Sequence, residues 1–304
     1  RRGGPVIGPG ARLGGYELLA RLGAGGQGEV FLARPWLAHG AAGRVGRWAL
    51  QVRLGAGWID ARSAHQQRLA ALKVAHPDAA ASLHDEHAHL RSIGAAHPHL
   101  ACLYSQRHPG AARDLGLAGR RVYLALAHEP GTPLDRVLAR RPLPVAWSIS
   151  IIVQLGLALA HLHQRGIIHH DVRAANVVVR PAGSCGLHAV LIALGAAETP
   201  AAPRRRAVYG TVGHLAPERL QDPPAPATPL VDLFGLGVLL RELTAGLNVS
   251  PALAEVVALA TEPDPAQRAA GLPTITALLE RLAALPEARK GQQQPGWFGL
   301  RCCP

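Results

Sequence analysis

The chain has 304 residues, of which 48% are apolar and 17% are charged; this allows one large domain or two lobes and excludes a wholly disordered chain. The net charge is +12, yet aromatic residues make up only 4%, so the stacking side chains of a single-strand binder are missing and we expect no nucleic-acid partner. Four scattered Cys are too few for a disulfide framework and favour a reducing, cytoplasmic location.

The first half of the chain has the pattern of a β-rich region. Residues 1–15 are basic and rich in Gly, and we expect a flexible lead-in without the apolar segment of a secretory signal. Residues 16–22 and 30–34 alternate like two strands of a hairpin around a glycine cluster. Residues 35–67 have no clear periodicity and are expected to be an insertion. The next expected elements are a strand at 69–74, a helix at 80–93, and strands at 101–106 and 121–128.

From residue 134 onward the periodicity becomes mainly helical. A long apolar helix is expected at 145–164, and a helix at 231–244 is apolar on most sides and therefore expected to be buried. No apolar stretch reaches the roughly 20 residues of a membrane span, so we expect no membrane segment in this chain. The other expected elements are strands at 177–180 and 189–193, helices at 253–261 and 275–285, and a polar tail over 286–304.

The chain contains no Met, and we therefore expect it to begin inside a longer product. A membrane anchor elsewhere in that product stays open. The sequence indicates no oligomeric state.

A glycine motif lies in the first expected hairpin. Gly23, Gly25 and Gly28 form the pattern G-x-G-x-x-G-x-V, which Leu22 precedes and Val30 completes. Glycines at these positions let backbone N–H groups approach phosphate oxygens without a clash from Cβ atoms, and Val30 can cover an adenine ring. The alternative is a plain hairpin turn, because a glycine-rich chain produces such spacings by chance.

The first Lys of the chain, Lys73, lies on the apolar strand that also contains Ala71. An isolated buried ammonium is costly, so Lys73 needs a partner, and Glu86 on the following helix is the obvious candidate. The alternative is a Lys that keeps an edge strand soluble.

A third motif lies in the loop at 167–177, between the long helix and the next strand. Asp171 is followed five residues later by Asn176, which places a carboxylate and an amide in one site. The carboxylate can orient a hydroxyl nucleophile and the amide can hold a metal ion. An ordinary helix-to-strand connection would account for Asp171 but not for the whole run.

Together these motifs resemble the eukaryotic-like, Hanks-type Ser/Thr protein kinases of bacteria, over residues 16–285. The family's H-R-D-L-K-P-x-N motif corresponds to the run from His169 to Asn176, and Ala216-Pro217-Glu218 corresponds to the end of its activation segment. Asp232 begins the buried helix, and Arg268 stands where the family has the Arg that pairs with this Glu.

The resemblance implies an α+β, bilobal fold with ATP between the lobes. An antiparallel β lobe with one helix covers residues 16–126, and a larger, mainly helical lobe covers 127–285. Protein hydroxyls are the implied substrate class, and a signalling protein is the implied partner.

The resemblance also implies roles for individual residues. Lys73, held by Glu86, contacts the α- and β-phosphates; Asp171 is the catalytic base. Arg173 and Asn176 complete the catalytic set, and Asn176 is the expected metal ligand. The remaining nucleotide contacts are Leu22, Gly23, Gly25, Gly28, Val30, Ala71, Leu126, Ala127, Glu129 and Val178. Among these, Leu126 is the gatekeeper, and the segment from Ala127 to Glu129 offers backbone hydrogen bonds.

The chain departs from the family where magnesium is bound. The family's D-F-G Asp corresponds to Ala193, no Asp lies between Asp171 and Asp222, and Glu198 comes five residues too late. Magnesium neutralises the charge that develops in phosphoryl transfer, so its loss lowers the rate by roughly 10²–10⁴. This departure argues against Mg²⁺ as a cofactor.

A second departure is His170, which replaces an Arg that reads a phosphate on the family's activation segment. Without this Arg, Thr199 and Thr211 are weaker candidates for phosphorylation sites that activate the domain. We therefore predict a pseudokinase or very weak kinase that serves as a signalling or binding module, with a basic partner surface at residues 204–206. The alternative is an active Ser/Thr kinase with Asp171 as its base.

Overall fold

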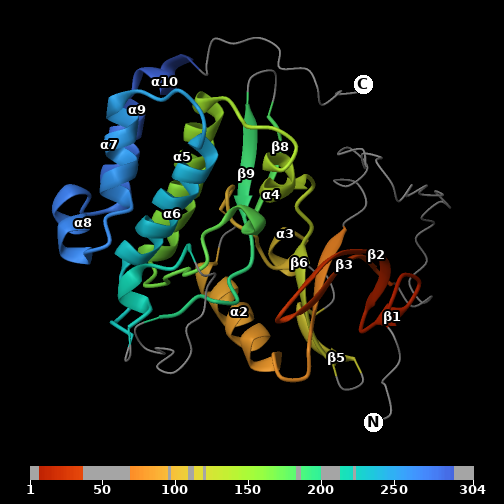
Figure 1. The fold of residues 1–304 in the computed structure, drawn as a ribbon. Coiled ribbons are helices and arrows are strands. Elements are labelled where there is room, and N and C mark those ends of the chain that lie inside the picture. Colours follow the sequence, from red (N-terminus) through yellow and green to blue (C-terminus); the bar gives the residue numbers. More distant parts are fainter. Residues whose placement is uncertain are drawn as a thin grey trace. The chain divides into compact units, whose positions relative to one another are not determined.

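The computed structural model describes residues 7–36, 69–94, 97–108, 113–118, 121–182, 186–199, 213–221 and 224–290. Most of the expected insertion, the Arg-rich segment 204–206, Thr211 and most of the polar tail lie outside these ranges. The chain divides into two compact units, and each is described by itself (Figure 1). Unit 1 comprises Arg1–Gly94 and Cys102–Pro130, and unit 2 comprises Ala95–Ala101 and Gly131–Pro304.

Unit 1 contains an antiparallel sheet with the strand order β1-β2-β3-β4-β6-β5 (Figure 1). Its strands are β1 (Arg12–Leu13), β2 (Tyr16–Gly25), β3 (Gly28–Pro35), β4 (Ala70–Ala75), β5 (Leu115–Ala118) and β6 (Arg121–Ala127). Alternating residues of the central strands, such as Phe31 and Leu72, bury one face of the sheet. Tyr16 packs edge-to-face on Tyr104 and Tyr123 in the same core, with ring centroids 5.7 and 6.1 Å away.

The described residues of unit 1 also form two helices, α2 (Ala80–Ile93) and α3 (Tyr104–Arg107). The prediction of a strand at 101–106 is wrong, because α3 occupies its second half. The side chain of Gln106 accepts a hydrogen bond from the N–H of Leu103 at 2.8 Å and donates to the carbonyls of Leu90 and Gly94. These bonds turn the chain and attach it to the end of α2. The short apolar run Ala101–Tyr104 looks like a buried strand in the sequence, and these four residues are indeed buried.

Unit 2 combines a three-stranded antiparallel sheet, in the order β7-β8-β9, with a set of helices. Its strands are β7 (Thr132–Pro133), β8 (Val177–Pro181) and β9 (Leu187–Leu191). Its α-helices are α4 (Leu134–Leu138), α5 (Val145–His163), α6 (Pro229–Thr244), α7 (Pro251–Ala260), α8 (Pro265–Gly271), α9 (Ile275–Ala284) and α10 (Pro286–Lys290). Two 3₁₀ turns, η1 (Ala174–Asn176) and η2 (Pro217–Arg219), lie in the loops.

Side-chain caps explain where several of these helices begin. Ser250, Asp264 and Thr274 each accept a hydrogen bond from a backbone N–H in the first turn of α7, α8 and α9, respectively. Pro follows the cap in α7 and α8, where its missing N–H costs no hydrogen bond.

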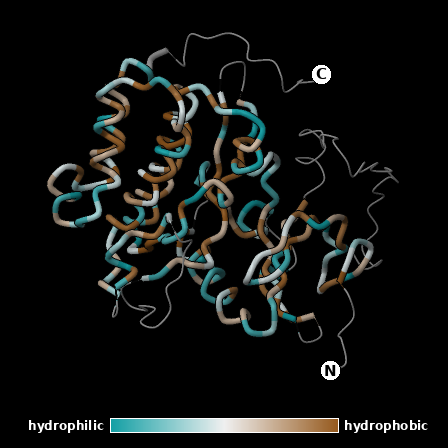
Figure 2. Tube along the Cα trace, in the orientation of Figure 1, coloured by the Kyte–Doolittle hydropathy of each residue, from teal (hydrophilic) through white to brown (hydrophobic). Residues whose placement is uncertain are grey.

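Helices α5 and α6 supply much of the core of unit 2, and Figure 2 shows the apolar residues along them. Among the helices that the structure describes, α5 alone is long and apolar enough to cross a membrane. A buried core helix passes the same test, and Ile151, Ile152 and Leu155 of α5 are fully buried within this unit.

Candidate functional site

The glycine motif of unit 1 forms the tight turn between β2 and β3, in which Gly25 pairs with Gly28. Gly28 has φ +153°, and a Cβ there would lie 2.0 Å from the carbonyl oxygen of Val74, so close packing on β4 requires glycine at this position. Gly23 and Gly25 differ, because open space lies where their Cβ atoms would be. Packing therefore explains Gly28, whereas Gly23 and Gly25 leave bare backbone that a phosphate could approach.

Lys73 forms the ion pair with Glu86 that the sequence predicts. Its Nζ lies 2.6 Å from Oε2 of Glu86, which is 0% exposed, and 3.0 Å from Oε1 of Gln27 in the glycine turn. The alternative of an edge-strand Lys is wrong, because β4 lies between β3 and β6 and Lys73 is 9% exposed. The pair joins β4 to α2 and holds the ammonium beside the glycine turn.

The side chains expected around adenine in unit 1 share one face of the sheet with this ammonium. Val30 pairs directly with Lys73, and Ala71 pairs directly with Leu126. Because Ala71 and Lys73 are two residues apart on one strand, all four side chains lie on the face opposite Phe31. Leu22 is exposed and lies at a register irregularity of β2. Val178 belongs to unit 2, where it is half-buried on β8.

Fewer backbone groups after Leu126 are available to bind a ligand than expected. The N–H of Ala127 donates to the carbonyl of Cys102 at 2.9 Å, and the N–H of His128 donates to the carbonyl of Leu69 at 3.1 Å. The carboxylate of Glu129 pairs with Arg107 at 2.5 Å. The expectation that backbone groups here bind adenine is therefore limited to the rest of the segment.

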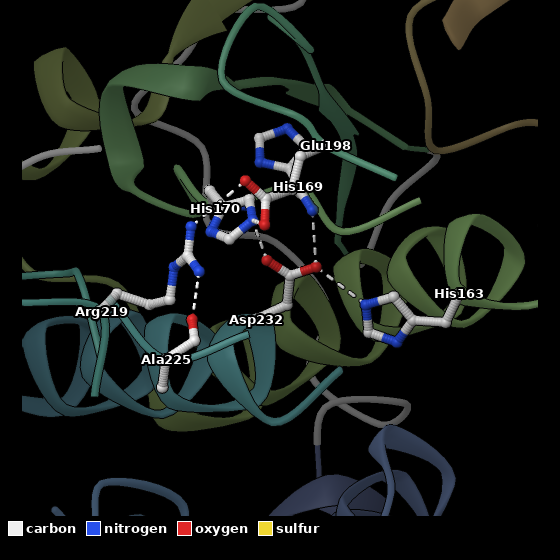
Figure 3. A network of polar contacts seen from close by, with 7 residues as sticks. All are labelled: His163, His169, His170, Glu198, Arg219, Ala225 and Asp232. Atoms are coloured by element: carbon white, nitrogen blue, oxygen red, sulfur yellow. Dashed lines mark hydrogen bonds and ion pairs between the residues drawn. The ribbon is translucent and has the colours of Figure 1, made fainter. Parts of the chain in front are cut away.

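In unit 2, Asp232 organises the loop that contains Asp171 (Figure 3). Its carboxylate accepts hydrogen bonds from the N–H groups of His169 and His170, both at 2.8 Å, and lies 2.8 Å from Nε2 of His163. Burial raises the pKa of Asp232, but the hydrogen bond to His163 and the charges of His163, His169 and His170 outweigh it and lower the pKa to about 2. An ionised carboxylate inside the unit thus fixes the backbone immediately before Asp171.

The structure brings Asp171 and Asn176 together. The Asn176 side chain donates to the Asp171 carbonyl at 2.9 Å and to its Oδ2 at 2.6 Å. The turn η1 closes through a bond from the N–H of Asn176 to the carbonyl of Arg173 and so brings Asn176 back toward Asp171. His169 accepts a bond from the N–H of Asp171 through its Nδ1 at 3.3 Å.

The register of β8 and β9 places Ala193 beside Asn176. Val177 pairs with Leu191, and the N–H of Ile192 donates to the carbonyl of Asn176 at 2.8 Å, so Ala193 comes one residue later. Ala193 has φ +69°, a left-handed conformation that Asn and Asp adopt more readily than Ala.

The side chain of Ala193 offers no oxygen ligand to Mg²⁺. Mg²⁺ prefers octahedral oxygen ligands that include carboxylates. Within the described parts of the chain, no group of three or more His, Cys, Asp or Glu side chains could hold a metal ion. Glu198 does not replace the missing carboxylate, because it pairs with His170 at 3.4 Å and with Arg219 at 3.2 Å.

Four residues of these sites were not assigned contacts from the sequence: Gln27, His163, Glu198 and Arg219. Gln27 lies inside the glycine motif and Arg219 follows Glu218 directly, but neither pattern names a partner. The expected pair of Arg268 with Glu218 is present, and it is buried.

The fold and these motifs are those of the protein kinase family. The protein kinase domain family matches residues 55–268, and the chain belongs to this family. The kinase domain of Mycobacterium tuberculosis PknI, crystallised as a double mutant, superposes with a TM-score of 0.60 and 21% identity over 94% of this chain and 100% of that one. The predicted fold class and the predicted resemblance are thereby confirmed.

Curated relatives are bacterial serine/threonine-protein kinases. PkaA of Streptomyces coelicolor is 29% identical over 225 residues, which are 72% of this chain and 39% of PkaA. PkaB of the same organism is 32% identical over 164 residues, 51% of this chain and 37% of PkaB. PknL of M. tuberculosis is 28% identical over 213 residues, 59% of this chain and 52% of PknL. The chain thus spans about half of these relatives' length or less.

Proposed function

We propose that this domain is a pseudokinase or very weak Ser/Thr kinase that binds a nucleotide and acts as a signalling or binding module. The observation that carries the proposal is the register of β8 and β9, which brings the backbone of Ala193 close to that of Asn176, where Ala193 has only a methyl group. The ion pair of Lys73 and Glu86 is present all the same. The domain therefore keeps the residues proposed to bind phosphate and lacks one of the side chains that would bind a metal ion.

ATP is the proposed ligand. The bare backbone at Gly23 and Gly25 approaches the phosphates, and the Lys73 ammonium pairs with their charge. Val30, Ala71 and Leu126 present an apolar surface to the adenine from the same sheet face. Mg²⁺, where a kinase binds it, bridges the β- and γ-phosphates and neutralises developing charge.

An active kinase is the second candidate, and the contact of Asp171 with Asn176 favours it. This pair is the arrangement that orients a protein hydroxyl for transfer: the carboxylate accepts the proton and the amide holds the carboxylate in place. The proposed substrate is then a Ser or Thr hydroxyl of a protein.

We also propose a cytoplasmic location and a protein partner. Cys102, which lies in the part of the chain that the structure describes, is a free and buried Cys, and this suits a reducing compartment.

Thermal unfolding with ATP, in excess MgCl₂ and in EDTA, tests the proposal. We expect ATP to raise the melting temperature in both conditions, and Lys73→Met to abolish the effect. Lys290→Met, at the other Lys of the chain, is the matched control and leaves it unchanged.

Two outcomes would contradict the proposal. A stabilisation that requires magnesium, together with radiolabelled-ATP turnover at ordinary kinase rates that Asp171→Asn abolishes, would establish the active enzyme. No stabilisation in either condition would leave a scaffold without a nucleotide.

A further inference from the structure

Glu198 links three segments of unit 2 through one buried side chain. It is 5% exposed, and its carboxylate lies 3.4 Å from Nε2 of His170 and 3.2 Å from Nη2 of Arg219 (Figure 3). Its backbone forms a two-bond bridge with Ile168, with the N–H of each residue donating to the carbonyl of the other at 2.9 Å. Both its backbone and its side chain therefore contact the loop that carries Asp171.

The contacts of Arg219 extend the link to the end of the activation segment. Its guanidinium also donates to the carbonyl of Ala225, and it directly follows Glu218, which pairs with Arg268. Arg219 is itself buried, at 8% exposed, so it depends on the Glu198 carboxylate for compensation of its charge.

His170 is held from two sides. Its backbone has φ +67°, a strained conformation for a residue with a side chain, and its N–H donates to Asp232. Its ring is 4% exposed and faces Glu198. Because Asp171 is the next residue, whatever fixes His170 also fixes the start of the Asp171 backbone.

We propose that Glu198 is a positioning residue that holds the Asp171 loop from within the chain, in the place of a phosphate on the activation segment. A phosphate supplies an anionic acceptor for cationic side chains, and the Glu198 carboxylate already supplies one to Arg219 and lies 3.4 Å from Nε2 of His170. A phosphate on the neighbouring Thr199 would bring like charge to a site whose cation, Arg219, is already paired. The loop is therefore ordered without phosphorylation.

The proposal rests on the proposed function, because it concerns the regulation of the same domain. Its test measures backbone hydrogen exchange and needs neither nucleotide nor turnover. A failure of ATP binding and a failure of this inference are therefore separate results.

The first comparison uses hydrogen exchange of the full chain over residues 168–176 and 193–199. Glu198→Gln keeps the size of the side chain and removes its charge, and we expect exchange there to become at least tenfold faster. The control is Glu255→Gln, whose carboxylate is 68% exposed and 3.8 Å from Arg281, and whose exchange stays at the wild-type rate. Unchanged exchange in Glu198→Gln would overturn the proposal.

The second comparison separates charge from packing, and it stays informative if Glu198→Gln does not fold. His170→Arg supplies a hydrogen-bond donor and a cation to Glu198, and we expect it to retain protection of both segments. His170→Leu fills space without a charge, and we expect it to lose protection. Equal protection in these two variants, or better protection with Leu, would show that His170 only packs.

Phosphatase treatment completes the test. The treated and untreated wild-type protein are expected to exchange at the same rate, and so is the variant with Thr199→Ala and Thr211→Ala. If dephosphorylation or this double substitution speeds exchange at 193–199, a phosphate holds the segment and the inference is wrong.

Discussion

Ala193 shows how much a single side chain decides in this domain. The backbone there has a left-handed conformation, with φ +69°, and the hydrogen bond from the N–H of Ile192 to the carbonyl of Asn176 holds this segment next to the backbone of Asn176. The backbone conformation at this position is thus one that Asp also adopts.

Restoring that carboxylate is the first prediction. Ala193→Asp is expected to make ATP-induced stabilisation stronger with magnesium than with EDTA and to raise phosphoryl transfer by roughly 10²-fold or more. Ala193→Asn is the matched control, because Asn also accepts a left-handed backbone but adds no charge. Thermal unfolding and a radiolabelled-ATP assay make the measurement, and equal behaviour of the two variants would argue that a missing charge is not the defect.

The ion pair of Lys73 with Glu86 gives a prediction about stability. Lys73→Met leaves Glu86 charged, fully buried and without its ammonium, which we expect to cost about 3–5 kcal/mol of unfolding free energy. Replacing both residues, in Lys73→Met with Glu86→Leu, removes the uncompensated charge and is expected to recover most of that loss. Urea unfolding measures both variants, with Lys290→Met as the control. A double variant no more stable than Lys73→Met would mean that the pair itself, rather than a stranded charge, stabilises unit 1.

At the scale of elements, the glycines in the turn between β2 and β3 have different roles. Gly28→Ala is expected to destabilise the protein by about 2–4 kcal/mol, because its Cβ meets the Val74 carbonyl and its φ is +153°. Gly25→Ala enters open space and is expected to change stability by less than about 1 kcal/mol while reducing ATP-induced stabilisation. Urea unfolding and ATP titration separate the effects. Equal losses of stability would contradict this division.

The sequence predicts well those helices and strands whose apolar residues recur with a clear period or flank a turn motif. The helix expected at 80–93 has those bounds in the structure, since Leu83, Glu86, Leu90 and Ile93 recur on one buried face. The hairpin around the glycine motif is likewise present as β2 and β3. Helix α3 was missed because it is a single turn held by Gln106, and strand β5 was missed because four residues carry too little periodicity.

Contacts between distant residues could not be predicted in the same way. The family resemblance implied Lys73 with Glu86 and Arg268 with Glu218, and both pairs are present. It gave no indication of Glu198 with His170 and Arg219, because here the chain departs from the family pattern. Such a contact depends on three loops that meet only after folding.

At the scale of the whole chain, each unit contains a His whose pKa is low. Burial lowers the pKa of His128 in unit 1 to about 4, and the charge of Arg107 adds to this. Burial lowers the pKa of His97 in unit 2 to about 4 as well, with further contributions from His161, His99 and Arg165. The rings of His97 and His161 lie 4.8 Å apart, so protonation of one disfavours protonation of the other.

These shifts predict that acid destabilises the protein. An unfolded His has a pKa near 6.5, so between pH 6.5 and about 4 the unfolded chain binds more protons than the folded chain. The stability that these His contribute is fully present above pH 6.5. It falls as the pH falls below 6.5, by on the order of 1 kcal/mol for each of these partly exposed His.

Thermal unfolding between pH 7.5 and pH 4.5 measures this loss. His97→Gln is expected to flatten the pH dependence, whereas His84→Gln, at an exposed position of α2, leaves it as in the wild type. A melting temperature that does not change over this range would contradict the prediction.

The hydrogen bond between Lys73 and Gln27 has a consequence for how fast a ligand arrives. Without a ligand, an amide oxygen from the tip of the hairpin already occupies one donor of the ammonium. An incoming anion that takes this oxygen's place breaks the side-chain bond, while the bond from the N–H of His76 to the carbonyl of Gln27 still holds the turn. Arrival of the anion and release of the Gln27 side chain are then one kinetic event, and shortening this side chain would speed the encounter.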